Sequence, residues 1–94
     1  MWRIVLLYAM TERAKDRQPE RPSGEMLKKL GNRIRSLREQ KGYSNYEKFA
    51  YEHNFSRAQY GRYEQGQNLS FKTLLRLVRA FDITLEQFFS EGFD

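Results

Sequence analysis

Helical spacing of apolar residues runs through most of this 94-residue chain and constrains its fold more than any other feature. In residues 25–41, apolar side chains recur at intervals of three and four and fall on one helix face: Leu27, Leu30, Ile34 and Leu37. Gly42 follows in the position where helices commonly end. No alternating strand pattern competes with this spacing, so the sequence predicts an all-α fold.

Side chains that can cap a helix N-terminus open four further segments. In chain order they are Ser44 with Glu47, Ser56 with Gln59, Ser70, and Thr84 with Gln87. Asn45 is an alternative cap for the first of these segments. The apolar faces that follow are Tyr46, Phe49, Ala50 and His53; Tyr60 and Tyr63, up to Gly66; Phe71, Leu74, Leu75, Val78 and Phe81; and Leu85, Phe88 and Phe89. We therefore expect five helices and no internal repeat.

Charge is distributed unevenly along the chain, whose formal net charge is +5. Residues 25–66 hold nine Lys or Arg against five Asp or Glu, a net of +4, whereas residues 67–94 carry a net of −1. A basic surplus of this kind suits a polyanionic partner, although many small domains carry similar charge for solubility. The chain has no cysteine, which suits a reducing cytoplasm, and its one histidine, His53, is expected in packing or a turn.

The first 24 residues differ from the rest and are expected to form a disordered tail before a domain at residues 25–94. The apolar run at residues 2–10 is too short for a membrane span, which needs about 20 residues. We interpret residues 1–9 as a possible mis-called start, with a strand or partner-binding segment as the alternative. Residues 11–24 contain both prolines and almost no apolar side chain. Their basic side chains suit either DNA phosphates or a solvated leader.

The segment from residue 44 to residue 66 is typical of two short helices joined by a tight turn. Its second helix carries Arg57 and Ala58 at the N-terminus and Arg62 one turn later, all on one outward face. Arginine can form paired hydrogen bonds to guanine O6 and N7, and alanine can contact a thymine methyl group. These three residues are the main candidates for reading DNA bases. Gln59 is either an adenine reader or, as we favour, the partner of the Ser56 cap.

The order and spacing of these segments resemble the Cro and phage-repressor type of helix-turn-helix domain, the XRE family, over about residues 27–90. The resemblance rests on IRSLREQKG, FA, SRAQYGRYEQG and LLRLVRAFDITLEQFF. It implies a compact five-helix, lambda-repressor-like domain that binds double-stranded DNA. It also implies an ion pair between Arg38 of the first helix and Glu64 at the end of the third. The segment before Ala50 is one residue longer than the common pattern, and Asn54 occupies a turn where the family often has glycine.

The resemblance further implies where the DNA backbone is contacted. Candidates are Ser44, Asn45 and Tyr46 at the N-terminus of the second helix, and Gln67 and Asn68 in the loop after the third. Helix N-termini offer free N–H groups to phosphates, and Arg35 and Lys48 are possible helpers. The family places buried aliphatic residues where Tyr60 and Tyr63 stand, so we expect both tyrosines in the core rather than stacked on bases. Gly61 indicates either a close approach or a tolerated surface glycine.

The sequence therefore predicts a cytoplasmic, sequence-specific DNA-binding transcriptional regulator. We expect a homodimer through the C-terminal helices, using Phe88, Phe89 and Phe93, although Phe88 and Phe89 can equally close the core. The alternative is a protein-interaction or antitoxin-like module on the same fold, and RNA binding lacks supporting motifs. No set of catalytic or metal-binding residues can be assembled, so we expect neither an enzyme nor a cofactor.

Overall fold

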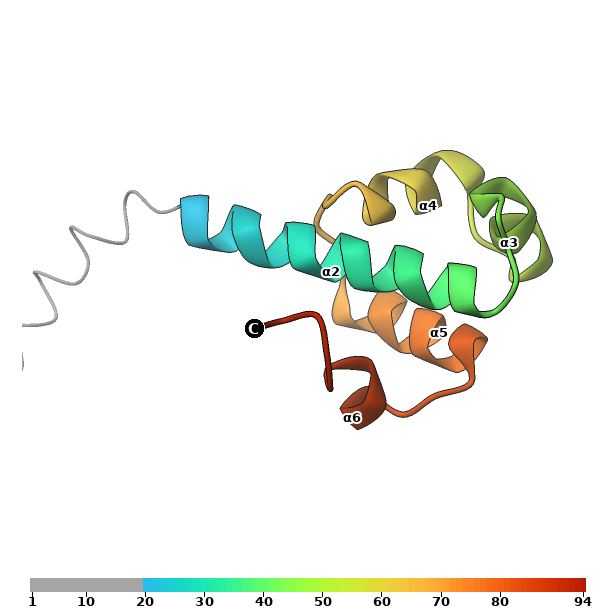
Figure 1. The fold of residues 1–94 in the computed structure, drawn as a ribbon. Helices are drawn as coiled ribbons and strands as arrows, with labels where there is room; N and C mark the ends of the chain where they lie inside the picture. The colour runs from blue at the N-terminus through green and yellow to red at the C-terminus, as the bar shows by residue number, and fades with distance from the viewer. Residues whose placement is uncertain (1–19) are drawn as a thin grey trace, which may run out of the picture.

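The computed structural model describes residues 20–94, with side chains from residue 24 onward, as five helices joined by short loops (Figure 1). They are α2 (Glu20–Gln40), α3 (Tyr46–Glu52), α4 (Arg57–Glu64), α5 (Phe71–Phe81) and α6 (Leu85–Phe88). The described residues contain no strand, so the all-α prediction with five helices is confirmed. Of the tail expected over residues 1–24, including the possible mis-called start at residues 1–9, residues 1–19 lie outside the described part.

Helix α2 begins at Glu20, five residues before the start that the sequence pattern indicates. The prediction took the proline-containing segment as part of a disordered tail. Pro22, however, falls in the first turn of the helix, where backbone N–H groups have no acceptor inside the helix. Proline is therefore compatible with this position, and its fixed φ suits the helix.

Helix α2 is the element against which the others assemble. It packs on α4, α3 and α5, while α3 also packs on α4 and α5 on α6. In Figure 1, α3 and α4 lie on one side of α2, and α5 and α6 lie on the other. The core between them holds eleven apolar side chains: Ile34, Leu37, Phe49, Ala50, Phe55, Tyr60, Leu74, Leu77, Val78, Phe81 and Phe88. The α3–α4 pair is thus mounted on a continuous core.

The buried stripe of α5 differs from the expected one. Leu74, Val78 and Phe81 are buried as predicted, and Leu77 joins them. Phe71 and Leu75, which were expected in the same stripe, are 62% and 42% exposed. A helix of this kind buries positions spaced at three and four residues, and the series that starts at position 74 leaves positions 71 and 75 on its outer edge. Two large apolar side chains of α5 therefore face outward.

Four helices end on a residue in the left-handed conformation. These residues are Gly42, Asn54, Gly66 and Asp82, with φ of 95°, 62°, 101° and 60°. At the end of α2, for example, Gly42 N–H donates to the Glu39 carbonyl at 2.9 Å and Tyr43 N–H to the Arg38 carbonyl at 3.2 Å. This pair of hydrogen bonds is the Schellman arrangement. The sharp ends keep the connecting loops short, and the expected roles of Gly42 and Asn54 are confirmed.

Candidate nucleic-acid interface

Helix α4 presents the residues expected at DNA bases at its N-terminus. Ser56 is the N-cap, and its side chain accepts a hydrogen bond from Gln59 N–H at 3.4 Å. Arg57 and Ala58 occupy the first turn, Arg62 lies one turn later, and all three side chains are exposed. Within the described residues, neither guanidinium forms an ion pair or a side-chain hydrogen bond. Two free arginines, one in the first turn and one in the last, therefore lie exposed on this short helix.

The side chain of Gln59 does not complete the cap that was favoured for it. Only the backbone N–H of Gln59 bonds to Ser56, and within the described residues its carboxamide forms no return bond to the cap. The true two-way capping box lies at α6, between Thr84 and Gln87. The exposed Gln59 carboxamide thus stays available beside Arg62, which leaves its expected position among the base-contacting residues intact.

The N-terminus of α3 is capped by Asn45 rather than by Ser44. Asn45 Oδ1 accepts hydrogen bonds from Glu47 N–H at 2.7 Å and from Lys48 N–H at 3.4 Å. The carboxamide reaches two N–H groups from a position one residue closer to the helix, so the pairing of Ser44 with Glu47 in a capping box is wrong. Ser44, Asn45 and Tyr46 are all exposed at this corner. The Asn45 cap uses its carboxamide oxygen for the helix N–H groups of Glu47 and Lys48.

The loop after α4 holds the second pair of residues expected at phosphates. Gly66 carries a left-handed φ of 101°, and Gln67 N–H donates to the Arg62 carbonyl at 2.9 Å. The side chains of Gln67 and Asn68 are exposed just beyond this closure. This closure ties the backbone of Gln67 to the last turn of α4, so the loop begins close to that helix.

A buried ion pair joins α4 to α2. Arg38 Nε donates to Glu64 Oε2 at 2.7 Å and Arg38 Nη2 to Glu64 Oε1 at 3.0 Å, and both side chains are nearly fully buried. Arg38 Nη1 also donates to the Tyr43 carbonyl at 2.7 Å, and Arg35 Nε lies 3.6 Å from Glu64 Oε1. The hydrogen bonds that Arg38 donates to the Glu64 carboxylate raise the pKa of Arg38. Such a two-point contact fixes the orientation of α4 as well as its position.

Gly31 brings the backbones of α2 and α4 together, a contact that the sequence analysis missed. A Cβ atom at this position would lie 2.6 Å from the Glu64 carbonyl oxygen and 2.7 Å from that of Tyr63. No side chain larger than hydrogen fits there without moving one helix. The signal was available in the sequence, since a glycine inside a strongly periodic helix often marks such an approach.

Gly61 serves the same purpose between α3 and α4. A Cβ atom there would lie 3.0–3.2 Å from the ring and hydroxyl of Tyr46, and Tyr46 also stacks on Tyr60 with ring centroids 6.2 Å apart. Of the two readings left open for Gly61, the close approach to a neighbouring helix is correct. Tyr60 is fully buried and Tyr63 partly buried against the core, as expected.

Arg76 of α5 supports the turn between α3 and α4, a role that the sequence did not indicate. Its Nη2 donates to the Asn54 carbonyl at 2.9 Å, and its guanidinium lies 4.3 Å from the centre of the Phe55 ring. Phe55 in turn stacks on Phe49 in the core. The turn that sets the angle between the two helices is therefore held from α5 as well as by the left-handed Asn54.

The aromatic residues expected at a dimer contact separate into two groups. Phe88 is fully buried and cannot contact a partner, which corrects its place among the expected interface residues. Phe89 is 47% exposed and lies 5.0 Å, centre to centre, from the partly buried Phe93. Phe88 packs into the core because α6 folds back on α2, where Arg33 binds the end of α6. Only Phe89 and Phe93 therefore offer outward aromatic surface at the C-terminus.

Other kinds of site find no support in the described residues. No group of three or more His, Cys, Asp or Glu in residues 24–94 is placed to hold a metal ion, and His53 packs on Phe49 with ring centres 4.4 Å apart. No helix in the described part is long and apolar enough to cross a membrane.

Comparison with known proteins gives one match. A protein-family model described as helix-turn-helix matches residues 34–88, which is more than half of the chain. Of the residues described above, Gly31, Arg33, Phe89 and Phe93 lie outside the match. Neither the curated proteins nor the solved structures return a match to this chain.

Proposed function

Because the chain belongs to the Cro/C1-type helix-turn-helix (XRE) family of DNA-binding regulators, we propose that it is a sequence-specific transcriptional regulator whose α4 enters the major groove. The observation that carries this proposal is the pair of free, exposed arginines, Arg57 in the first turn and Arg62 in the last turn, on a helix that is anchored on its other face. Arg57, Ala58 and Arg62 read base edges in this proposal, with Gln59 as an additional contact.

Phosphate contacts on both sides of α4 hold it in register in this proposal. The Tyr46 N–H and the Asn45 carboxamide bind one strand, helped by Ser44 and Lys48. The Gln67 and Asn68 amides bind the other. Because most of these groups are uncharged, few counterions are released on binding, and we expect a moderate dependence of affinity on salt.

We further propose that the protein acts as a homodimer in the cytoplasm, through Phe89 and Phe93. A single module covers one half-site, and two-fold dimers that read half-sites about one helical turn apart are the common arrangement. The exposed aromatic surface beyond α6 supports a contact at this end of the molecule.

Selection of bound sequences from a random DNA pool, followed by gel-shift titration, tests the proposal. We expect a defined half-site, and we expect Arg57→Ala with Arg62→Ala to lower affinity for it by about 100-fold or more, since each paired contact to guanine contributes roughly 1–3 kcal/mol. The matched control is Lys29→Ala with Arg79→Ala, which removes the same charge away from α4 and should change affinity only slightly. A pool without enrichment, together with equal losses in both double variants, would contradict sequence-specific reading.

A further inference from the structure

The outer face of α5 carries a row of basic side chains beside a row of apolar ones. Lys72, Arg76 and Arg79 are exposed and spaced at four and three residues, so they fall along one line of the helix. Leu75, 42% exposed, lies beside that line; Ile83 further along is partly buried, and Val78, 7% exposed, belongs to the core beneath them. Together with Asp82 these six side chains line an open groove of about 520 Å³.

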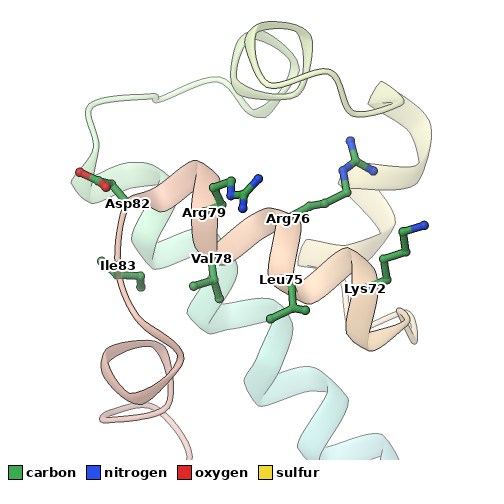
Figure 2. A pocket seen from close by; sticks show the side chains of 7 residues that line it. All are labelled: Lys72, Leu75, Arg76, Val78, Arg79, Asp82 and Ile83. Atoms are coloured by element: carbon green, nitrogen blue, oxygen red, sulfur yellow. The ribbon is translucent and has the colours of Figure 1, made fainter.

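The two rows point in different directions from α5. In Figure 2, Lys72, Arg76 and Arg79 extend toward the α3–α4 turn, and Leu75, Val78 and Ile83 extend away from it. Leu75 lies three residues from Lys72 and four from Arg79, so it borders both cations on the helix surface and lines the same groove. Arg76 is engaged by the Asn54 carbonyl and the Phe55 ring, whereas within the described residues Lys72 and Arg79 have no acidic partner in ion-pair range. Three cations against the one carboxylate of Asp82 leave the groove with a net charge of +2.

We propose that this groove binds an acidic amphipathic helix of a partner protein. A helix laid along α5 would set its carboxylates against Lys72 and Arg79 and its apolar side chains over Leu75 and Ile83. The apolar row is the observation that distinguishes this partner from DNA. Phosphates would use the cations but would leave Leu75 and Ile83 in water, whereas an amphipathic helix covers both rows at once.

The position of the groove lets this partner bind while α4 is occupied. The residues proposed to read bases lie on α4, and the groove lies on α5, beyond the turn that Arg76 supports. The inference does not depend on the DNA sequence that α4 prefers or on sequence-specific binding at all. A regulator of this kind would bind a second protein on one surface and DNA on another.

The probe is a synthetic helical peptide of about two turns or more, capped at both ends, with Glu along one stripe and Leu along the neighbouring stripe. Its binding to the full chain is followed by two-dimensional NMR of the labelled protein and by fluorescence anisotropy. We expect saturable binding with amide shifts concentrated in residues 72–83. A peptide of the same composition, scrambled so that no stripe remains, and one with Lys in place of Glu should both bind about tenfold more weakly or worse.

Leu75→Glu with Arg79→Glu should lower affinity for the probe by about tenfold or more, because it removes one apolar contact and reverses one charge. The matched control is Tyr51→Glu with Lys41→Glu, which makes the same change of charge at an exposed aromatic residue and an exposed lysine of other elements. We expect that control to bind the probe within about twofold of the parent protein.

Three results would overturn the inference. The first is the absence of saturable binding to the striped peptide, and the second is an equal loss of affinity in the two double variants. The third comes from titration with a random-sequence DNA duplex at low salt. If the duplex shifts residues 72–83 more than it shifts α4, the basic row binds phosphate and not a protein helix. The double variant Arg57→Ala with Arg62→Ala separates the two proposals. If it loses duplex binding but still binds the peptide, the result bears on DNA binding by α4 and leaves the peptide groove of α5 in place.

Discussion

Three side chains in the centre of the molecule decide how α4 is held. Arg38 and Glu64 form a two-point ion pair out of water, and the fully buried Tyr60 lies beside them. Charges buried in this way are costly unless both partners are present. The orientation of the proposed base-reading helix therefore depends on residues that do not touch DNA themselves.

Glu64→Gln should destabilise the protein strongly at neutral pH. The substitution keeps the shape of the side chain but leaves the Arg38 guanidinium buried without a counter-charge, at a cost of roughly 3–5 kcal/mol. Thermal unfolding followed by circular dichroism should show a melting temperature lower by about 10 °C or more. Glu39→Gln, at an exposed position of the same helix as Arg38, is the control and should melt close to the parent. An unchanged melting temperature in Glu64→Gln would show that the pair does not anchor α4.

Tyr60→Phe should cost little at neutral pH and reduce the sensitivity of the fold to alkali. Within the described residues the Tyr60 hydroxyl is buried without a hydrogen-bond partner. Burial first, and the Glu64 carboxylate second, raise the pKa of Tyr60 well above its ordinary value. Below about pH 10 the folded and unfolded states both keep the proton. Above it only the unfolded state releases the proton, so stability falls as the pH rises.

Denaturant unfolding at pH 7 and at pH 10.5 separates these two effects. The free energy of unfolding of Tyr60→Phe should match or exceed that of the parent at pH 7, because an unpaired buried hydroxyl contributes nothing favourable. Its loss between the two pH values should be smaller than the loss in the parent. Tyr51→Phe, at an exposed tyrosine, should keep the pH dependence of the parent. A large loss of stability at pH 7 would indicate that the hydroxyl is paired in solution.

Among the helices, α6 depends most on a single contact from another element. Arg33 of α2 donates to the carbonyls of Phe88 at 2.7 Å and Gln87 at 2.8 Å, and its guanidinium lies 3.3 Å from a Glu91 carboxylate oxygen. Both carbonyls belong to the end of a four-residue helix. The Gln87 carbonyl also accepts hydrogen bonds from Ser90 Oγ at 2.7 Å and Ser90 N–H at 3.2 Å, whereas the Phe88 carbonyl is bound by Arg33. One buried arginine thus closes the C-terminal end of the fold.

Arg33→Ala should release α6 before the rest of the domain. Two charge-assisted hydrogen bonds are lost, one to the buried Phe88 carbonyl and one to the partly buried Gln87 carbonyl, so the local cost should be roughly 2–4 kcal/mol. Hydrogen exchange should show faster exchange of the Phe88 and Phe89 amides, while those of α4 remain protected. Lys28→Ala, at an exposed position of α2, is the control and should leave exchange in α6 unchanged. Uniform acceleration across all helices would mean that α6 unfolds only with the whole domain.

The elements were largely predictable from the sequence because their signals are local. Spacing and caps predicted the order of the helices, and the caps Ser56, Ser70 and Thr84 are confirmed. The start of α2 was missed because a polar, proline-containing segment has the same composition whether it forms a tail or the first turn of a helix. The exposure of Phe71 and Leu75 was missed for a different reason. A wide apolar stripe does not indicate which of its edges packs against another helix.

Contacts between elements were predictable only where a family resemblance supplied them. The pairing of Arg38 with Glu64 came from that resemblance, and the structure brings the two residues together. Arg33 and Arg76 bind backbone carbonyl groups at least 22 residues away in the chain, and Gly31 lies against two such groups. Every residue has a backbone carbonyl, so the sequence does not indicate which of them is contacted. Such contacts become visible only once the helices are placed in space.

At the scale of the whole molecule, the proposed dimer depends on a small aromatic surface beyond α6. Phe89→Asp should weaken self-association, because it places a charge in the centre of that surface. Sedimentation equilibrium should show a shift from dimer toward monomer, and DNA affinity should fall as the second half-site contact is lost. Phe71→Asp, at a comparably exposed phenylalanine of α5, is the control and should leave the sedimentation mass unchanged. A parent protein that sediments as a single chain at the concentrations that saturate DNA would contradict the dimer.

The direct backbone approach at Gly31 has a consequence for the heat of DNA binding. At Gly31 no side chain separates the two backbones, and the Arg38–Glu64 pair ties the same two helices together, so the proposed reading helix should meet DNA already in its final place. Binding then carries no folding step, and the heat-capacity change measured by titration calorimetry should correspond to the contact area alone. On warming, DNA affinity should persist until the domain itself melts, with no earlier loss of the reading helix.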